Sequence, residues 1–298
     1  MTESLRKAAI GIFAAAFALA ATGSTIAPVS AETGVTDTEI VLGGTHPYSG
    51  PASAYGNIGK GIAAYFSYVN DHGGVNGRKI KYIDKDDGYS PPQTVQLVHQ
   101  MVEQDKVFAI FDTLGTAPNA AIRPYLNQLG IPQIFVATGA STWGHDAQKF
   151  PWTIGWQPDY QSEAILYAKD ILQNHPKAKI GVLFQNDDYG EDYNAGLKRG
   201  LGKHQDMIVK MASYETTDPS VGSQIATLKA SGADTFMIFA TPKFAIQAMV
   251  LAAQQSWHPV IYLNNVSAAV PFMNAAAKAG GLAAVNGVIS TIYLKDPA

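Results

Sequence analysis

Residues 40–84 read IVLGGTHPYSGPASAYGNIGKGIAAYFSYVNDHGGVNGRKIKYID. Residues 40–43 predict a strand. Residues 54–70 predict a helix, because Ile58, Ile62 and Phe66 recur at helical spacing on one face. The glycine-rich run 72–77 is typical of a stop and a turn, and residues 79–84 alternate like a second strand. The stretch is therefore expected to form a strand–helix–strand unit, the building block of parallel sheets.

The same alternation continues to the end of the chain. Up to residue 136, helices are expected over 91–106 and 118–129, and strands over 107–111 and 131–136. Further helices are expected over 159–172, 189–201, 220–230, 243–255 and 270–278, and further strands over 179–184, 207–214, 235–239, 259–263 and 288–292. We predict an α/β fold of two doubly wound parallel-sheet lobes, joined by an extended hinge crossover over 152–159.

The N-terminal segment has the order of a secretory signal. Arg6 and Lys7 precede an apolar run over 8–21, and small residues then end at Ala31. The alternative, a membrane anchor, is weakened because the run is shorter than the roughly 20 residues that a spanning helix needs. We expect 1–31 to be a signal peptide cleaved after Ala31, followed by an N-terminal lobe over 32–156 and a C-terminal lobe over 157–292, outside the cytoplasm.

Composition excludes several classes of function. The net charge of −3 gives no case for nucleic acid, whose binders carry basic patches. The absence of cysteine excludes disulfides, thiol nucleophiles and Cys-based metal sites. Apolar residues make up 47% of the chain, so large cores can be buried.

Catalytic and metal motifs were sought without success. The sequence contains no Gly-x-Ser-x-Gly elbow, no phosphate-binding loop and no His-x-x-x-His pair. Asp84, Asp86 and Asp87 resemble the start of a calcium loop, but Val95 stands where the twelfth-position acid is required. A solvated strand end is the preferred interpretation of these acids. We therefore expect a protein that is not an enzyme, with no cofactor and no metal.

Two strand ends have the composition of a binding site. Residues 112–116, DTLGT, follow one expected strand, and residues 137–141, ATGAS, follow the next. In open α/β sheets ligands bind beyond the carboxyl ends of the strands. Hydroxyls and free N–H groups at helix starts suit an anionic carboxylate, although ordinary helix capping by Thr and Ser would give the same pattern.

The order of several motifs resembles a known family. Ser49-Gly50-Pro51 and Tyr55-Gly56 precede the helix, the run 70–77 (NDHGGVNG) follows it, and the run 186–192 (NDDYGED) follows a strand of the second lobe. Together with the signal segment, these motifs resemble the type I periplasmic solute-binding proteins, specifically the leucine/isoleucine/valine (branched-chain amino acid)-binding family of ABC transporters. The resemblance runs from about Thr36 to the end of the chain.

The resemblance implies a mechanism and a site. A small ligand would enter a cleft between two lobes that hinge shut, and the closed protein, expected to be a monomer, would dock on a membrane permease. The carboxylate cradle would fall on 113–116, with Ala137 and Gly139 adding main-chain contacts and Tyr55 and Tyr189 walling the pocket from opposite lobes. The full set of expected ligand-binding residues is Tyr55, Thr113, Leu114, Gly115, Thr116, Ala137, Thr138, Gly139, Tyr189, Thr241, Asn264 and Asn265.

The sequence departs from the family pattern in two places. Family members hold the ligand's ammonium with an acid just after the strand that here ends at Leu263, but residues 264–267 read NNVS. A buried ammonium without a counter-charge is costly, so the hypothesis is a carboxylate without the amino group, such as an aromatic or fatty acid, in place of a branched-chain amino acid. The chain also stops at Ala298, where residues 293–298 would begin a return crossover, and we expect a truncated chain with an incomplete first lobe.

Two other classes of function stay open from the sequence. The first is a ligand-sensing receptor ectodomain of the same fold, and the second is an extracellular hydrolase. The hydrolase would need a nucleophile or a metal constellation, which the motif search did not find.

Overall fold

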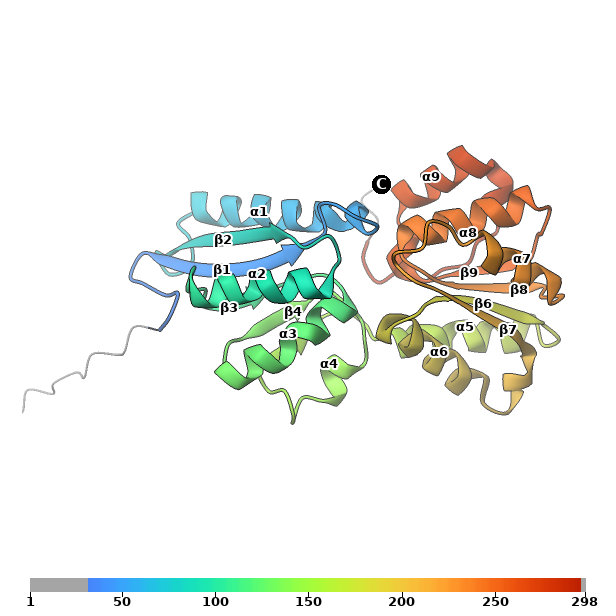
Figure 1. Ribbon diagram of the computed structural model, residues 1–298, viewed down its shortest axis with the longest axis horizontal. Coiled ribbons are helices and arrows are strands. Elements are labelled where there is room, and N and C mark those ends of the chain that lie inside the picture. The colour runs from blue at the N-terminus through green and yellow to red at the C-terminus, as the bar shows by residue number, and fades with distance from the viewer. Residues whose placement is uncertain (1–31, 296–298) are drawn as a thin grey trace, which may run out of the picture. The chain divides into compact units, whose positions relative to one another are not determined.

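The computed structural model describes residues 32–295, and the expected signal segment 1–31, its cleavage site and residues 296–298 lie outside them. Two separate parallel sheets organise the described residues (Figure 1). The first sheet has the strand order β2-β1-β3-β4-β5, and the second has the order β7-β6-β8-β9. The two sheets confirm the predicted two-lobed α/β fold.

The first sheet and its helices occupy the N-terminal half of the chain. Its strands are β1 (Glu39–His46), β2 (Lys79–Asp86), β3 (Ala109–Phe111), β4 (Gln133–Val136) and β5 (Thr153–Gly155). Its helices are α1 (Gly56–Asp71), α2 (Pro91–Glu103), α3 (Thr116–Leu129) and α4 (Thr142–His145).

Helices cover both faces of the first sheet. Phe66 and Ile62 of α1 pack on one face with Leu42 of β1. On the other face, Met101 of α2 and Leu126 of α3 enclose a second apolar cluster (Figure 1). This three-layer arrangement leaves the carboxyl ends of the strands free for the loops that follow them.

The second sheet is built in the same way. Its strands are β6 (Ile180–Gln185), β7 (Ile208–Tyr214), β8 (Thr235–Phe239) and β9 (Val260–Leu263). Its helices are α5 (Tyr160–Asn174), α6 (Asp188–Leu201), α7 (Gly222–Ala230), α8 (Pro242–Gln254) and α9 (Val270–Gly280). One core cluster joins the sheet to α5 and α6, and another joins it to α7, α8 and α9.

Local signals explain several element boundaries. Pro91 and Pro92 open α2, where the missing N–H of proline leaves no helical bond unmade. Asp187 caps α6 by accepting from the main-chain N–H of Tyr189, and α3 ends at Gly130 with a φ of 69°.

Two expected elements differ from the structure. Thr153–Gly155 lies inside the predicted crossover 152–159, yet it pairs with β4 as the fifth strand of the first sheet. The strand predicted over 288–292 is wrong, because only Ile289 bridges Tyr262 of β9, while the surrounding residues form no ladder. Val288, the residue before Ile289, is apolar and packs against the core of the second lobe. This packing explains why the segment has the composition of a strand.

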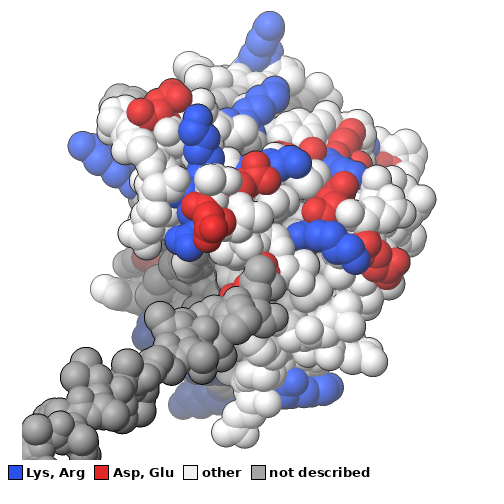
Figure 2. Space-filling model, turned by 90° about the vertical axis from the view of Figure 1, so that its left-hand side faces the viewer, with Lys and Arg blue, Asp and Glu red and all other residues white. Residues whose placement is uncertain are grey.

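Charges of both signs are mixed on one face of the protein. Figure 2 shows Lys and Arg side chains beside Asp and Glu on the part of this face that the structure describes. That part of the face has no extended field of one sign, which is the kind of field that steers a highly charged partner. Within residues 32–295, no helix is both long and apolar enough to cross a membrane.

Candidate functional site

The two predicted loops of the first lobe pair with each other. Beyond the ends of β3 and β4, Leu114 and Ala137 form a parallel bridge. The Ala137 N–H donates to the Thr113 carbonyl at 3.0 Å, and the Gly115 N–H donates to the Ala137 carbonyl at 3.2 Å. The structure therefore brings together four of the predicted residues, at the carboxyl edge where the sequence placed them.

The threonines of these loops are buried and hydrogen-bonded. Thr116 and Thr138 share a hydrogen bond of 2.6 Å between their hydroxyls, and each side chain is almost fully buried. The Thr113 hydroxyl accepts from the Thr45 N–H at 3.2 Å. Thr116 is also the first residue of α3, so these hydroxyls surround the amino end of a 14-residue helix, where partial positive charge gathers.

Two glycines let other groups approach the loops closely. Gly115 has a φ of 102°, and a Cβ there would lie 2.5 Å from the Tyr89 ring. Gly139 accepts from the Tyr160 N–H at 2.8 Å, and a Cβ on it would lie 2.5 Å from the Pro158 carbonyl oxygen. Both positions therefore require glycine, for positive φ in the first case and for close packing in both.

In the second lobe, Thr241 and Tyr189 lie at strand ends. The Thr241 N–H donates to the Tyr214 hydroxyl at 3.0 Å, and Tyr214 contacts the Gln185 side chain at 3.0 Å. Tyr189 packs edge-on against Tyr160, with ring centroids 5.3 Å apart. These side chains form the buried polar and aromatic end of the second sheet.

Asn264 and Asn265 follow β9 directly. The Asn264 side-chain amide donates to the Tyr189 hydroxyl, and Asn264 is fully buried. The main-chain and side-chain N–H groups of Asn265 both donate to Glu163 of α5. Burial raises the pKa of Glu163, although hydrogen bonds from Tyr167 and other donors oppose that rise.

Tyr55, like Gly139, is a predicted residue that contacts the other lobe. Its hydroxyl donates to the Val266 carbonyl at 2.9 Å, and its ring meets Phe272 edge-on at 6.2 Å. Ser141 makes a second contact of this kind, donating from its N–H at 2.9 Å and its hydroxyl at 2.6 Å to Asp192 of α6. The two lobes therefore touch through hydrogen bonds next to the predicted site loops.

Burial keeps the phenols of this region neutral. It raises the pKa of Tyr55, Tyr89 and Tyr189 well above 10, and repulsion between phenolates adds to the rise for Tyr55 and Tyr189. Each tyrosine is therefore a neutral donor and acceptor at any physiological pH.

The sequence did not identify Glu163, Tyr89 or Tyr160 as members of this region. Glu163 sits in the first turn of α5, where an acid normally serves the helix dipole, so its position gave no sign of a contact 102 residues away. Tyr89 has a φ of 62°, a backbone conformation that its position in the sequence does not indicate.

Of the acids interpreted as a solvated strand end, only Asp86 is exposed, and the interpretation is wrong for Asp84 and Asp87. Asp84 accepts from the Tyr48 hydroxyl and lies 2.9 Å from Nδ1 of His46, whose side chain is fully buried. Asp112 lies 3.9 Å from Nε2 of the same imidazole. We name His46, Tyr48, Asp84 and Asp112 the His46 cluster.

Asp87 is buried after the end of β2, whereas Asp86 is exposed. Asp87 is 1% exposed, and it accepts from the Tyr89 N–H and from the Thr94 hydroxyl at 2.8 Å. Asp86 accepts from the Tyr48 N–H at 2.9 Å. These carboxylates hold the loops after β1 and β2 together, and no group of three or more potential metal ligands occurs between residues 32 and 295.

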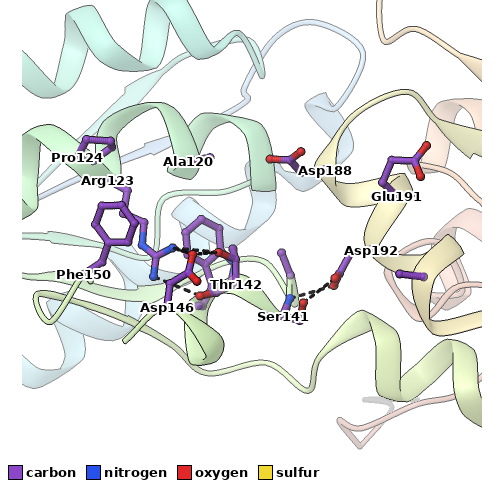
Figure 3. Close-up of a pocket in the computed structure, with 13 residues that line it drawn as sticks. Ala120, Arg123, Pro124, Ser141, Thr142, Asp146, Phe150, Asp188, Glu191 and Asp192 are labelled. Carbon is purple, nitrogen blue, oxygen red and sulfur yellow. Dashed lines mark hydrogen bonds and ion pairs between the residues drawn. The ribbon is translucent and has the colours of Figure 1, made fainter. Parts of the chain in front are cut away.

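Two cavities lie beside the site loops, and neither is lined by the predicted residues. One of about 450 Å³ lies among α3, α4 and α6, where Arg123 stacks on Phe150 at 4.2 Å and donates to Thr142 (Figure 3). Asp188 and Glu191 of α6 form its acidic wall. The other, of about 580 Å³, is bounded by residues 50–51, 88–91, 216–217 and Lys243.

Comparison with known proteins agrees with this architecture. The model of the family described as "Periplasmic binding protein" matches residues 39–297. The chain is 24% identical over 201 residues to an "Amino acid binding protein" of Pseudomonas aeruginosa, covering 66% of this chain and 52% of that protein. It is 25% identical over 213 residues to "Leu/Ile/Val-binding protein homolog 1" of Brucella abortus, covering 70% of this chain and 56% of that protein.

A solved structure shows the same fold. The substrate-binding periplasmic protein from Ralstonia solanacearum superposes with a TM-score of 0.74 at 27% identity, covering 85% of this chain and 69% of that chain. The present chain spans about half the length of the curated relatives it matches. With the family match over most of the chain and two parallel-sheet lobes, the protein belongs to the periplasmic binding protein family.

Proposed function

We propose that this chain is the exported substrate-binding component of an ABC importer. It binds a small carboxylate between its lobes in the periplasm, without transforming it, and a membrane permease accepts the loaded protein. Family membership supports the binding role. Two relatives, an amino acid-binding protein and a Leu/Ile/Val-binding protein homologue, are named for small organic acids, which supports a ligand of that class.

One observation carries the proposal. The hydroxyls of Thr116 and Thr138 meet at the amino end of α3, Thr113 lies on the loop before it, and Tyr55 reaches from this lobe to Val266 of the other. Hydroxyls and helix N–H groups stabilise a carboxylate without a formal cation. A cradle on one lobe and a direct contact to the other are what a two-lobed binding protein needs.

The ligand is a carboxylate that lacks an α-ammonium. The position after β9 holds amides, Asn264 and Asn265, where an ion pair with an ammonium would need an acid. The nearby Glu163 carboxylate is occupied by the N–H groups of Asn265. A buried ammonium would therefore remain without a free counter-charge.

Calorimetric titration tests this function. The chain should bind 4-methylpentanoate or 3-phenylpropanoate with measurable heat and should not bind their primary amides, which lack the anion. Thr138→Val should weaken the tighter acid about 10-fold, since a hydrogen bond to a charged group contributes about 1.5–3 kcal/mol. Thr227→Val, on an exposed face of α7, is the matched control and should change nothing. Equal binding of acids and amides, or tight binding of leucine alone, would refute the proposal.

A further inference from the structure

Asn264 has a buried acceptor with no partner. Its side-chain N–H₂ donates to the Tyr189 hydroxyl, and its side-chain oxygen has no hydrogen-bond partner among the described residues. The residue is 0% exposed. A buried carbonyl oxygen without a donor is costly to the folded protein, so this oxygen indicates a donor that arrives from outside the chain.

Asn265, which is only partly buried, presents a second side-chain amide next to it. Its side-chain N–H₂ and its main-chain N–H, at 2.7 Å, are both given to the Glu163 carboxylate. The amide oxygen is consequently the end directed away from Glu163, and it makes no hydrogen bond within the described chain. Asn264 and Asn265 are thus two consecutive amides whose nitrogens are engaged and whose oxygens are free. We name them the amide pair.

Two carboxylates of the second lobe, Glu163 and Asp187, are committed to protein donors. Glu163, 5% exposed, also accepts from the Tyr167 hydroxyl at 2.6 Å and the Tyr193 hydroxyl at 2.8 Å, so four donors surround its two oxygens. Asp187 accepts from the Gln185 side chain at 2.6 Å and from two N–H groups at the start of α6. Neither carboxylate has an oxygen free to pair with a ligand cation.

The amide pair lies where the lobes meet. Tyr55 of the first lobe donates to the carbonyl of Val266, the residue directly after the pair, and Tyr189 holds Asn264 from α6. Under the proposed function, a ligand held by the threonine loops of the first lobe would meet the amide pair across this lobe contact. The side-chain oxygens of the pair can only accept hydrogen bonds.

We propose that the amide pair recognises a hydroxyl group beside the ligand's carboxylate, so that the ligand is a 2-hydroxy carboxylic acid, and that Glu163 is the positioning residue that turns the Asn265 oxygen toward it. The inference rests on the proposed function, since the hydroxyl is defined relative to a bound carboxylate. A 2-ammonium would be buried without a free counter-charge. A 2-oxo group would place the lone pairs of its oxygen against those of the amide oxygens. An acid without a substituent at carbon 2 would leave the amide oxygens without a donor.

A matched ligand series tests the inference on the unmodified chain. On the 4-methylpentanoate skeleton and again on the 3-phenylpropanoate skeleton, calorimetry compares 2-hydroxy, 2-oxo, 2-amino and unsubstituted acids. The 2-hydroxy acid should bind about 5- to 10-fold tighter than the unsubstituted acid, the gain of one neutral hydrogen bond. It should bind at least about 10-fold tighter than the 2-amino acid, which must bury an unpaired cation.

A variant separates positioning from general stability. In Glu163→Gln, the new side-chain N–H₂ faces the Asn265 amide, which must turn to offer its oxygen to Gln and its N–H₂ to the ligand. The preference for 2-hydroxy over 2-oxo acid should then fall to 1 or invert, because a 2-oxo group accepts from N–H₂. Asp170→Asn is the control on the same helix, since Asp170 bonds to Tyr262 and Asn174, away from the amide pair, and should keep the wild-type preference.

The outcomes are distinct. The inference is overturned if the 2-amino acid or the unsubstituted acid binds as tightly as the 2-hydroxy acid. The protein would then remain a carboxylate-binding protein. Heat from none of the eight acids overturns the proposed function and this inference with it. If Glu163→Gln fails to fold, Asn264→Leu removes the buried oxygen at similar volume, and it should reduce the hydroxy advantage to about 1. An unchanged advantage overturns the role of the amide pair.

Discussion

The His46 cluster predicts a loss of stability in mild alkali. His46 is fully buried in the first lobe, between the Asp84 carboxylate at 2.9 Å and the Asp112 carboxylate at 3.9 Å. Burial alone would lower the pKa of the imidazole, but the two carboxylates outweigh it and raise that pKa to about 9. The protonated ring is therefore part of the native core at neutral pH.

The magnitude follows from the pKa of His46 in the two states. A group whose pKa is higher in the folded than in the unfolded protein stabilises the fold fully below its unfolded pKa and loses that stabilisation as the pH rises through its folded pKa. Here the window runs from 6.5 to about 9. Because one pKa unit is worth about 1.4 kcal/mol, the free energy of unfolding should fall by about 3 kcal/mol across the window.

Urea unfolding at steps of pH between 6 and 10 measures this fall, with tryptophan fluorescence as the signal. His46→Gln should lose about 3 kcal/mol at the acidic end, where the two carboxylates lose their cation, and should flatten the pH profile. His99→Gln, which alters a surface pair with Glu103 on α2, is the matched control and should keep the wild-type profile. A wild-type profile that is flat from 6.5 to 9, or a His46→Gln profile as steep as the wild type, would refute the reasoning.

Four further substitutions have expected outcomes. Gly59→Ala places a methyl group inside the His46 cluster, 2.8 Å from the imidazole, and should lower the free energy of unfolding in urea by about 1–3 kcal/mol. Gly61→Ala has open space around it and should stabilise α1 by about 0.5–1 kcal/mol. Asp187→Ala removes the cap of α6 and should lower unfolding stability by about 1 kcal/mol, and an unchanged midpoint would argue against the cap. Tyr55→Phe removes the bond to Val266 and should weaken ligand affinity by about 0.5–1.5 kcal/mol in calorimetry, with little change in the melting of either lobe; unaltered affinity would contradict that role.

Much of the fold could be predicted because each element carries its own local signal. Apolar spacing and proline placement located α1 and α2 to within a few residues. The β5 strand, Thr153–Gly155, was missed because three residues are too few to show an alternating period. The segment around Ile289 has strand composition, yet only one bridge forms, since composition does not specify a pairing partner.

The candidate site was predictable only in part, for a reason of geometry. Chain order and the rule for parallel sheets were enough to place Thr113 and Ala137 at one edge. Contacts between side chains of different elements were not predictable. His46 lies diagonally across from Asp84, because the residue opposite Asp84 in the register is Gly44, which has no side chain to separate them. The register of β1 on β2 cannot be derived from the acids of residues 84–87, whose sequence only suggests an exposed strand end.

Recognition and lobe contact are joined in one short segment. Residues 264–267 carry the free amide oxygens, and within the same four residues Val266 accepts the hydroxyl of Tyr55 from the first lobe. A ligand can shift the balance between open and closed lobes only by the difference between its contacts in the two states. Contacts to the threonine loops alone exist with the lobes apart and give no such difference. A ligand donor that also reaches Asn264 and Asn265 would give such a difference, because the ligand would then contact both lobes beside the Tyr55 contact. Under the proposed function, the group that selects the ligand would thus also be the group through which binding favours closure.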